Sequence, residues 1–414
     1  MRTPTTLLPV LSLLAAAVAG GLTTIPADAA APPPTCLGQR ATVVGTPGAD
    51  TMTGTPGPDV VVALGGDDVV DGRGGDDLVC GGPGADVLHG GAGDDRLAGG
   101  EDRVTPDRGQ DVFGDRLAGG PGDDWLDAGP RGTGNVVQPD TVTWEDAAAG
   151  VAIDLSGAQG TATGEGTDTI VLGAGLRVEA SAHDDVVVGG PRTDRIRAGA
   201  GDDSVSTGDG SDHVVLDPPG GDPSGDDRLD LGPGGGLSYQ SARSNGGRDA
   251  VVTAGGASEY VFVRGRQPVT VAVGDGGDTV ELRADVRGAR VDLGAGDDAV
   301  RLRGGRGQHA RTATVDARAG TLAAAGVAGT STLTGVESWA LAYGAAWTFL
   351  GSDARDLLDL TLSDGATTVR LRGGDDRVIA GPHADDLAGG QGRDRVLRGG
   401  ADDSCRGFAV GGCG

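Results

Sequence analysis

The 414-residue chain contains no lysine and few aromatic residues, and both shortages restrict its function. Without lysine there is no P-loop for nucleotide phosphates. Aromatic residues make up 3% of the chain, too few for a wide surface that stacks sugar rings. No H-E-x-x-H zinc motif, G-x-S-x-G nucleophile elbow or EF-hand loop is present. We therefore expect a protein that is not an enzyme.

Positive charge is also scarce. The net charge is −27, and arginine supplies all of the positive charge in scattered positions. Nucleic acids and anionic membranes would be repelled by such a chain, so neither is expected as a partner. Glycine is abundant, with 81 residues, but it does not recur every third residue as in collagen.

What the sequence does contain is a row of aspartates spaced nine residues apart. Each has a glycine two places before it and an apolar residue two places after it, and a fixed short period of this kind predicts a stacked repeat architecture. The aspartates of this row are Asp50, Asp59, Asp68, Asp77, Asp86 and Asp95.

The unit G-G-x-G-x-D-x-U-x divides into six residues that turn and three that extend. Glycine takes the positive backbone angles that tight loops need. Successive extended residues face opposite ways, so the middle residue, such as Leu88 in the unit 81–89, points into the core. The aspartate and the loop carbonyls offer hard oxygen ligands, which suit calcium rather than zinc or copper.

These units strongly resemble the RTX (haemolysin-type) nonapeptide repeats. The resemblance implies an all-β fold, a parallel β-roll or β-helix solenoid, with calcium ions bound between loops stacked one turn apart. Asp68 would then share ion sites with the loops of Asp50 and Asp86, and not with those of Asp59 and Asp77. Further candidate ligands in phase with the motif are Asp115, Asp124, Asp185, Asp194, Asp203, Asp212, Asp376, Asp385, Asp394 and Asp403.

Other units are isolated or altered. Single units occur at Asp227, Asp278, Asp298 and Asp356, and Asp227 has no proper counterpart eighteen residues away. Ala63, His183, Arg192 and His383 replace motif glycines, which weakens the prediction of calcium there. The steps from Asp95 to Asp115, Asp278 to Asp298 and Asp356 to Asp376 are each twenty residues, which predicts full turns with slightly enlarged loops.

The N-terminal residues are typical of an export signal. Arg2 precedes an apolar stretch from Leu7 to Val18 and an A-x-A site at residues 27–29. We expect an extracellular protein, secreted through this signal peptide and without a membrane anchor.

Four cysteines in a secreted chain predict two disulfides. In a solenoid of order 100 Å, at 4.8 Å per turn, cysteines at opposite ends cannot pair. The remaining pairs are Cys36–Cys80 and Cys405–Cys413, and a zinc site is the less favoured alternative.

Between the motif blocks, alternating strands persist and one pattern recurs. Residues 151–170 are echoed by residues 314–337, which resembles the connecting coils without calcium found between RTX blocks. The expected organisation is a signal peptide (1–29), an N-terminal arm (30–44), repeat blocks (45–130, 185–216 and 351–404), degenerate coils (131–184 and 217–350, the latter with loop-rich insertions) and a C-terminal cap (405–414).

Two functions fit this organisation. The first is a structural or adhesive calcium-binding protein whose repeats fold on binding several ions, with a cell-surface or polysaccharide partner still to be identified. The second is a β-helix enzyme acting on extracellular polysaccharide, with a site between Gly220 and Leu350. Its candidate substrate contacts are Arg243, Arg248, Arg264 and Arg266, and His309 is the one candidate histidine near them.

Overall fold

The computed structural model describes most of the chain after its N-terminal segment. The described residues are 32–105, 111–130, 135–216, 225–234, 236–240, 248–253, 256–263, 265, 267–304, 311–399 and 402–409. All regular elements in these ranges are β-strands. The described part of the chain has no helix of the length and hydrophobicity needed to cross a membrane.

Most strands belong to two sheets, which we call the first sheet and the second sheet. In pairing order the first sheet contains β4 (Thr51–Thr53), β6 (Val69–Asp71), β8 (Val87–His89), β12 (Arg116–Ala118), β15 (Thr141–Thr143), β19 (Arg177–Glu179), β21 (Arg195–Arg197), β23 (Asp212–Val215), β25 (Gly236–Gln240), β27 (Tyr260–Val263), β30 (Thr279–Arg283), β33 (Ala299–Arg303), β37 (Ser338–Ala342), β39 (Leu357–Asp359), β41 (Arg377–Ile379) and β43 (Arg395–Arg398).

The second sheet collects the strands that lie between these in the chain. In pairing order it contains β3 (Val43–Val44), β5 (Val60–Val62), β7 (Leu78–Cys80), β9 (Arg96–Ala98), β13 (Trp125–Asp127), β18 (Thr167–Ile170), β17 (Gly160–Thr163), β16 (Ala152–Asp154), β20 (Val186–Val188), β22 (Ser204–Ser206), β24 (Arg228–Asp230), β26 (Asp249–Val252), β28 (Val269–Ala272), β31 (Arg290–Asp292), β36 (Ser331–Thr334), β35 (Thr321–Ala324), β34 (Arg311–Asp316), β38 (Ala345–Leu350), β40 (Thr368–Arg370), β42 (Asp386–Ala388) and β44 (Ser404–Arg406).

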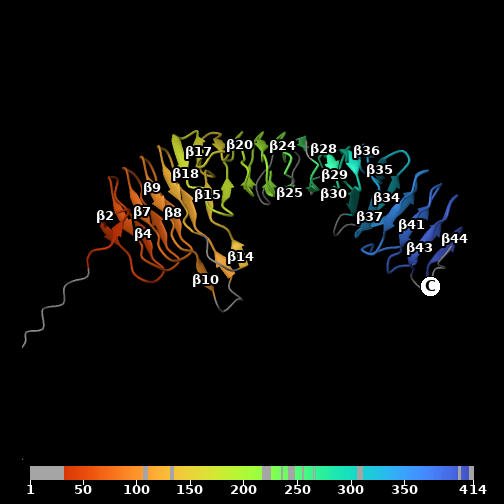
Figure 1. Ribbon diagram of the computed structural model, residues 1–414, viewed down its shortest axis with the longest axis horizontal. Coiled ribbons are helices and arrows are strands. Elements are labelled where there is room, and N and C mark those ends of the chain that lie inside the picture. The colour runs from red at the N-terminus through yellow and green to blue at the C-terminus, as the bar shows by residue number, and fades with distance from the viewer. Residues whose placement is uncertain are drawn as a thin grey trace, which may run out of the picture. The chain divides into compact units, whose positions relative to one another are not determined.

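The chain crosses from one sheet to the other after almost every strand, so it forms a parallel β-roll (Figure 1). In the first block the register is one full turn of eighteen residues, because Met52 pairs with Val70 and Val70 with Leu88. Two nonapeptide units therefore make one turn. The predicted solenoid and its register are confirmed.

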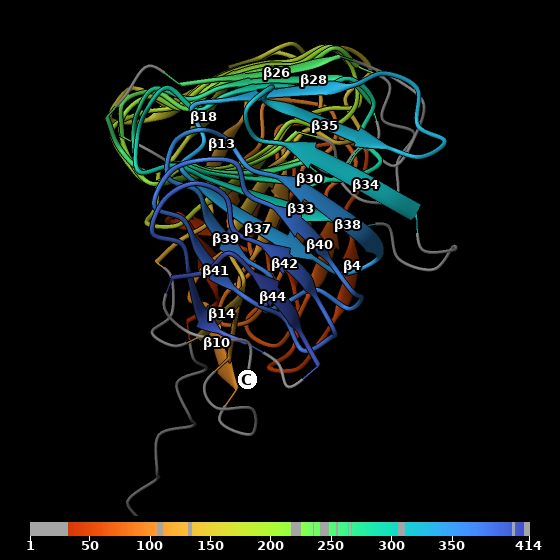
Figure 2. The same cartoon turned by 90° about the vertical axis from the view of Figure 1, so that its right-hand side faces the viewer.

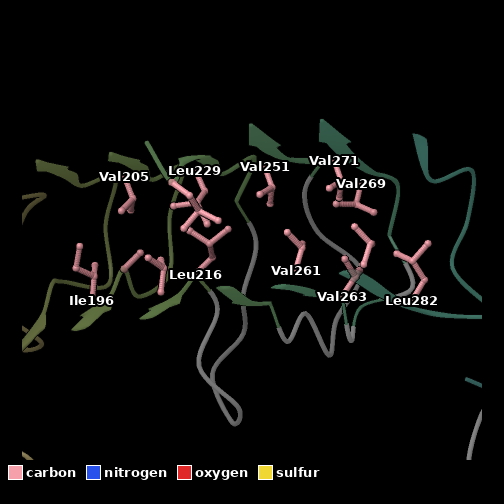
Figure 3. Packing of buried hydrophobic residues seen from close by; sticks show 14 of the residues in the cluster. Ile196, Val205, Leu216, Leu229, Val251, Val261, Val263, Val269, Val271 and Leu282 are labelled. Carbon is pink, nitrogen blue, oxygen red and sulfur yellow. The ribbon is translucent and has the colours of Figure 1, made fainter. Parts of the chain in front are cut away.

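The core is the space between the two sheets. The middle residue of each three-residue strand points into it, and Val70, Val79, Leu88 and Leu97 have no exposed surface. Figure 3 shows the same arrangement farther along the chain, where the residues that face one another are Val205, Leu229, Val251 and Val271 from the second sheet and Ile196, Val261 and Leu282 from the first. Burying one such side chain contributes about 1.5–3 kcal/mol.

The prediction for one of the three twenty-residue spacings is wrong. The twenty residues from Asp95 to Asp115 are not an enlarged turn, because Leu88 pairs with Leu117 and Leu97 with Leu126, a register of 29 residues in each case. The additional chain contributes two strands of a separate side sheet, β10 (Arg103–Thr105) and β11 (Asp111–Phe113), and β11 pairs with β14 (Asn135–Gln138). The other two twenty-residue steps are full turns, as predicted.

The internal echo corresponds to two matching insertions in the second sheet. The strands β16, β17 and β18 form one antiparallel three-strand meander, and β34, β35 and β36 form the other. Figure 2 shows β34 and β35 side by side. The equivalence of the two segments is confirmed, but their pairing is antiparallel, unlike that of the surrounding roll.

The N-terminal arm is tied to the first block. The strands β1 (Thr35–Cys36) and β2 (Gln39–Arg40) form a small hairpin, and Cys36 is joined to Cys80 at the end of β7, with 5.6 Å between their Cα atoms. This confirms the first predicted disulfide. Cys413 lies outside the described residues, so the Cys405–Cys413 disulfide stays a prediction. The proposed signal peptide (1–29) also lies outside them.

Candidate metal sites

The motif aspartates stack in two rows, one beside each sheet, because each aspartate lies at or directly before the start of a strand. We call them the first-sheet row and the second-sheet row. In most members one carboxylate oxygen accepts the backbone N–H of the residue one turn earlier, at 2.7–3.2 Å. In the first-sheet row the acceptors are Asp68, Asp86, Asp115, Asp140, Asp212, Asp278, Asp298, Glu337, Asp376 and Asp394. In the second-sheet row they are Asp77, Asp95, Asp124, Asp168, Asp185, Asp203, Asp227, Asp249, Asp385 and Asp403.

This arrangement confirms the predicted stacking of loops one turn apart. The N–H of Asp50 donates to Asp68 Oδ1 at 2.7 Å, and the N–H of Asp68 donates to Asp86 Oδ1 at 2.9 Å. Asp59 and Asp77 belong to the other row. The carboxylates of one row are therefore close enough to share ions, whereas sequence neighbours nine residues apart are not.

The second carboxylate oxygen divides the predicted ligands into two groups. In the first block it is buried and has no hydrogen-bond partner in six residues, which we call the open carboxylates: Asp68, Asp77, Asp86, Asp95, Asp115 and Asp124. A buried carboxylate oxygen without a partner is costly, and a bound cation is one way to satisfy it.

Outside the first block, Asp212, Asp278, Asp298 and Asp376 also have a buried second oxygen without a hydrogen-bond partner. In other loops the second oxygen is satisfied within the loop. It accepts the backbone N–H of the residue four places earlier, at 2.5–3.1 Å. We call these the closed carboxylates: Asp50, Asp59, Asp185, Asp194, Asp356, Asp385 and Asp394. Their loops include those in which His183, Arg192 and His383 replace the motif glycine.

The backbone angle of the residue four places before the aspartate separates these two groups. Before Asp86 and Asp95 this residue is Gly82 or Gly91, with φ of +114° and +111°. Its N–H then donates to a carbonyl of the next turn, at 2.8 Å, instead of to the aspartate. Asp115 is the exception among the open carboxylates, because the residue four places before it, Asp111, lies in β11 and does not have such an angle.

In two of the open loops, the residue with this positive φ is not a glycine. Leu64, before Asp68, has a φ of 81°, and Arg73, before Asp77, has a φ of 76°. Each costs about 1–3 kcal/mol of backbone strain, and strain of this kind concentrates at binding sites.

The first glycine of a unit makes room for the open oxygen. A Cβ atom at Gly81 would lie 2.2 Å from Asp86 Oδ2 and 2.8 Å from the carbonyl oxygen of Gly99 in the next turn. Carboxylate and carbonyl oxygens thus meet beside a bare Cα atom, and both are ligands that Ca²⁺ prefers. By donor type, burial and space, these loops fit calcium.

The electrostatics of the metal-free rows are unfavourable. Burial raises the pKa of Asp86 and Asp95 to about 7, and that of Asp115 and Asp124 to about 8. The hydrogen bond from the preceding turn lowers each pKa, but neighbouring carboxylates raise it again. Near neutral pH these groups therefore resist ionisation unless a cation accompanies them.

Sequence reasoning missed five members of the rows: Asp140, Asp168, Asp249, Glu259 and Glu337. Each lies at or next to the start of a strand and has an apolar residue two places later, so a search for this shorter pattern without fixed spacing would have found them. The isolation expected of Asp227 is wrong. It accepts the N–H of Asp203 and donates its own N–H to Asp249, because larger loops change the spacing to 24 and 22 residues.

The alternative enzymatic site is mostly outside the described residues, which exclude Arg243, Arg264, Arg266 and His309. Arg248 is described and exposed. The same region has a buried carboxylate on the outer face of the first sheet, Glu281, which contacts Arg303 at 2.6 Å and the Tyr260 hydroxyl at 2.8 Å.

Comparison with known proteins supports the assignment of the rows. A family model described as the RTX calcium-binding nonapeptide repeat matches the chain in four copies, over residues 44–79, 81–106, 111–130, 179–214 and 362–396. No curated protein matches the chain.

A solved structure with some similarity is a hyperactive, Ca²⁺-dependent, β-helical antifreeze protein from an Antarctic bacterium. It is 14% identical over 83% of this chain and 84% of that chain, with a TM-score of 0.25, and a likeness at that score supports no conclusion here. The family matches, by contrast, fall on the coils whose loops carry the carboxylate rows. The chain therefore contains RTX calcium-binding nonapeptide repeats.

Proposed function

We propose that this chain is a secreted structural or adhesive protein without catalytic activity, which acquires its folded form when calcium fills its open carboxylate loops. The observation that carries the proposal is the set of buried, unpartnered carboxylate oxygens in the first block. Folding without a cation would place these charges close together in a dry environment.

Calcium removes this penalty by supplying positive charge between the turns. The residues that would hold it are the open carboxylates together with nearby loop carbonyls, such as that of Gly99 beside Asp86. Ions bound only by the folded form add their binding free energy to folding. At a free concentration 100 times the dissociation constant, each site adds roughly 2.7 kcal/mol.

The difference between open and closed carboxylates predicts the order in which the loops bind calcium. The second oxygen of each closed carboxylate already accepts a backbone N–H, and Asp385 accepts two such groups, from Thr367 and Gly381. Calcium would have to displace such a hydrogen bond, so the open loops of the first block should fill at the lowest calcium concentration.

Secretion and a mechanical role are supported by independent features. The Cys36–Cys80 disulfide suits an oxidising compartment, where calcium is also abundant. A stack of similar coils offers a repetitive surface, which suits scaffolding or adhesion.

The experiment is a calcium titration of the full chain without its leader, followed by far-ultraviolet circular dichroism. We expect the 45–130 block to be largely disordered in chelator and β-rich in millimolar calcium, with magnesium at the same concentration far less effective. Identical spectra in chelator and calcium would refute calcium-coupled folding.

A polysaccharide-degrading enzyme is the second candidate, favoured by buried Glu281 on the surface of the first sheet. Its contacts with Arg303 and Tyr260 are equally those of a structural ion pair. The test is release of reducing ends from acidic and neutral polysaccharides by the wild-type chain and by Glu281→Gln. Release that the substitution abolishes would favour the enzyme and contradict the non-catalytic proposal.

A further inference from the structure

Three buried carboxylates meet where the chain leaves the roll to form the side sheet. They belong to Asp102, Asp115 and Asp140, and each offers an oxygen that lies within 4.8 Å of those of the other two. Their residues are 8%, 1% and 4% exposed. Asp102 and Asp140 do not belong to the nonapeptide motif.

The fold brings them together from three positions. Asp115 and Asp140 come directly before β12 and β15, which are neighbours in the first sheet, and the N–H of Asp115 donates to Asp140 Oδ1 at 3.1 Å. Asp102 comes directly before β10 and forms a parallel bridge with Gly84. Figure 1 shows β10 and β14 of the side sheet close to this part of the roll.

A separate observation points to a ligand. Asp115 Oδ1 accepts the N–H of Asp86 at 2.8 Å, but its Oδ2 is buried and has no hydrogen-bond partner. The charges that act on Asp115 are those of Asp86, Asp140 and Asp102, which are all negative. The open oxygen of Asp115 is buried beside these negative charges, so it calls for a cation.

We propose that Asp102 and Asp140, which lie outside the nonapeptide motif, join the open carboxylate of Asp115 in a divalent-cation site, which binds calcium and fixes the point where the side sheet leaves the roll. Three carboxylates without histidine or cysteine favour calcium, magnesium or manganese over zinc and copper. Calcium is preferred because it tolerates irregular oxygen coordination, whereas magnesium demands near-octahedral geometry. The identity of the ion and the open oxygen of Asp115 rest on the proposed function, whereas the added ligands Asp102 and Asp140 do not.

The test is the number of calcium ions bound per full chain, measured by equilibrium dialysis at saturating calcium. Asp102→Asn removes one ligand charge and leaves both carboxylate rows intact. Glu101→Gln is the matched control, because it removes the same charge from the adjacent, exposed residue. We expect Asp102→Asn to lose about one ion and Glu101→Gln to lose none.

Asp140→Asn is the second variant, since asparagine keeps an oxygen that can accept the Asp115 N–H. It should lose the same ion while its circular dichroism in calcium matches that of the wild type. Wild-type stoichiometry and affinity in both variants would overturn the proposal. So would failure of both variants to fold in saturating calcium, because the repeat sites remain available. If the wild-type chain bound no calcium, both this proposal and the proposed function would be refuted.

Discussion

Replacing Asp86 with asparagine separates the hydrogen-bonding role of an open carboxylate from its charge. The asparagine oxygen can still accept the N–H of Asp68, which now donates to Asp86 Oδ1 at 2.9 Å. The buried charge disappears. Raising the pKa from 3.8 to about 7 corresponds to about 4 kcal/mol at neutral pH, at 1.36 kcal/mol for each unit.

Whether Asp86→Asn stabilises or destabilises the protein should therefore depend on calcium. In chelator at pH 7, Asp86→Asn should be more stable than the wild type, by up to about 4 kcal/mol. In calcium the order should reverse, because the variant lacks a charged ligand and needs more calcium to fold.

Asp385→Asn is the matched control. Both oxygens of Asp385 accept backbone N–H groups, at 2.8 and 3.1 Å, so an amide must place its NH₂ against one of these donors. This substitution should cost about 1–3 kcal/mol with or without calcium.

The assay is urea unfolding of the full chain by circular dichroism at pH 7, in chelator and in calcium. An osmolyte added equally to all samples keeps part of the metal-free protein folded. If Asp86→Asn were destabilised in chelator as much as Asp385→Asn, the open and closed carboxylates would not differ and our division of the rows would be wrong.

Three further predictions concern pH, the disulfide and the loop glycines. The folded-state pKa of Asp115 is about 8, above its usual 3.8, so its contribution to the stability of the metal-free protein is full below pH 3.8 and is lost as pH rises through 8. The protein in chelator should therefore gain β-structure on acidification. A loss of β-structure at pH 4.5 relative to pH 7 would contradict this. Reduction of Cys36–Cys80, which closes a loop with a separation of 44 residues, should lower the unfolding free energy by about 4 kcal/mol in urea titrations, and an unchanged midpoint would count against it. Gly91→Ala should raise the calcium midpoint of folding strongly, because φ is +111° and the new Cβ would lie 2.2 Å from the Arg73 carbonyl oxygen, whereas Gly57→Ala meets nothing within 4 Å; equal midpoints for the two variants would refute the steric argument.

The regular part of the fold was predictable because a nine-residue period has one simple structural solution. Leu88 and its equivalents are buried as the alternation of faces requires. The departures were not predictable from spacing, because hydrogen bonding between turns tolerates loops of different length. Asp86 pairs with Asp115 across 29 residues and Asp124 with Asp168 across 44. Whether a carboxylate is open or closed depends on a backbone angle, which Leu64 and Arg73 adopt although their side chains disfavour it.

In the carboxylate rows the hydrogen bonds between turns run from an N–H of one turn to a carboxylate of the following turn, and this gives the stack a direction. A coil emerging first from a membrane or a ribosome has its backbone donors unsatisfied until the following coil delivers its aspartates. If the coils fold in order from the N-terminus, only the last folded coil has unsatisfied backbone N–H groups. Each new coil satisfies them and becomes the new edge. A chain shortened at its C-terminus would leave one such edge, whereas a break in the middle would create a second folding front that lacks the Cys36–Cys80 anchor.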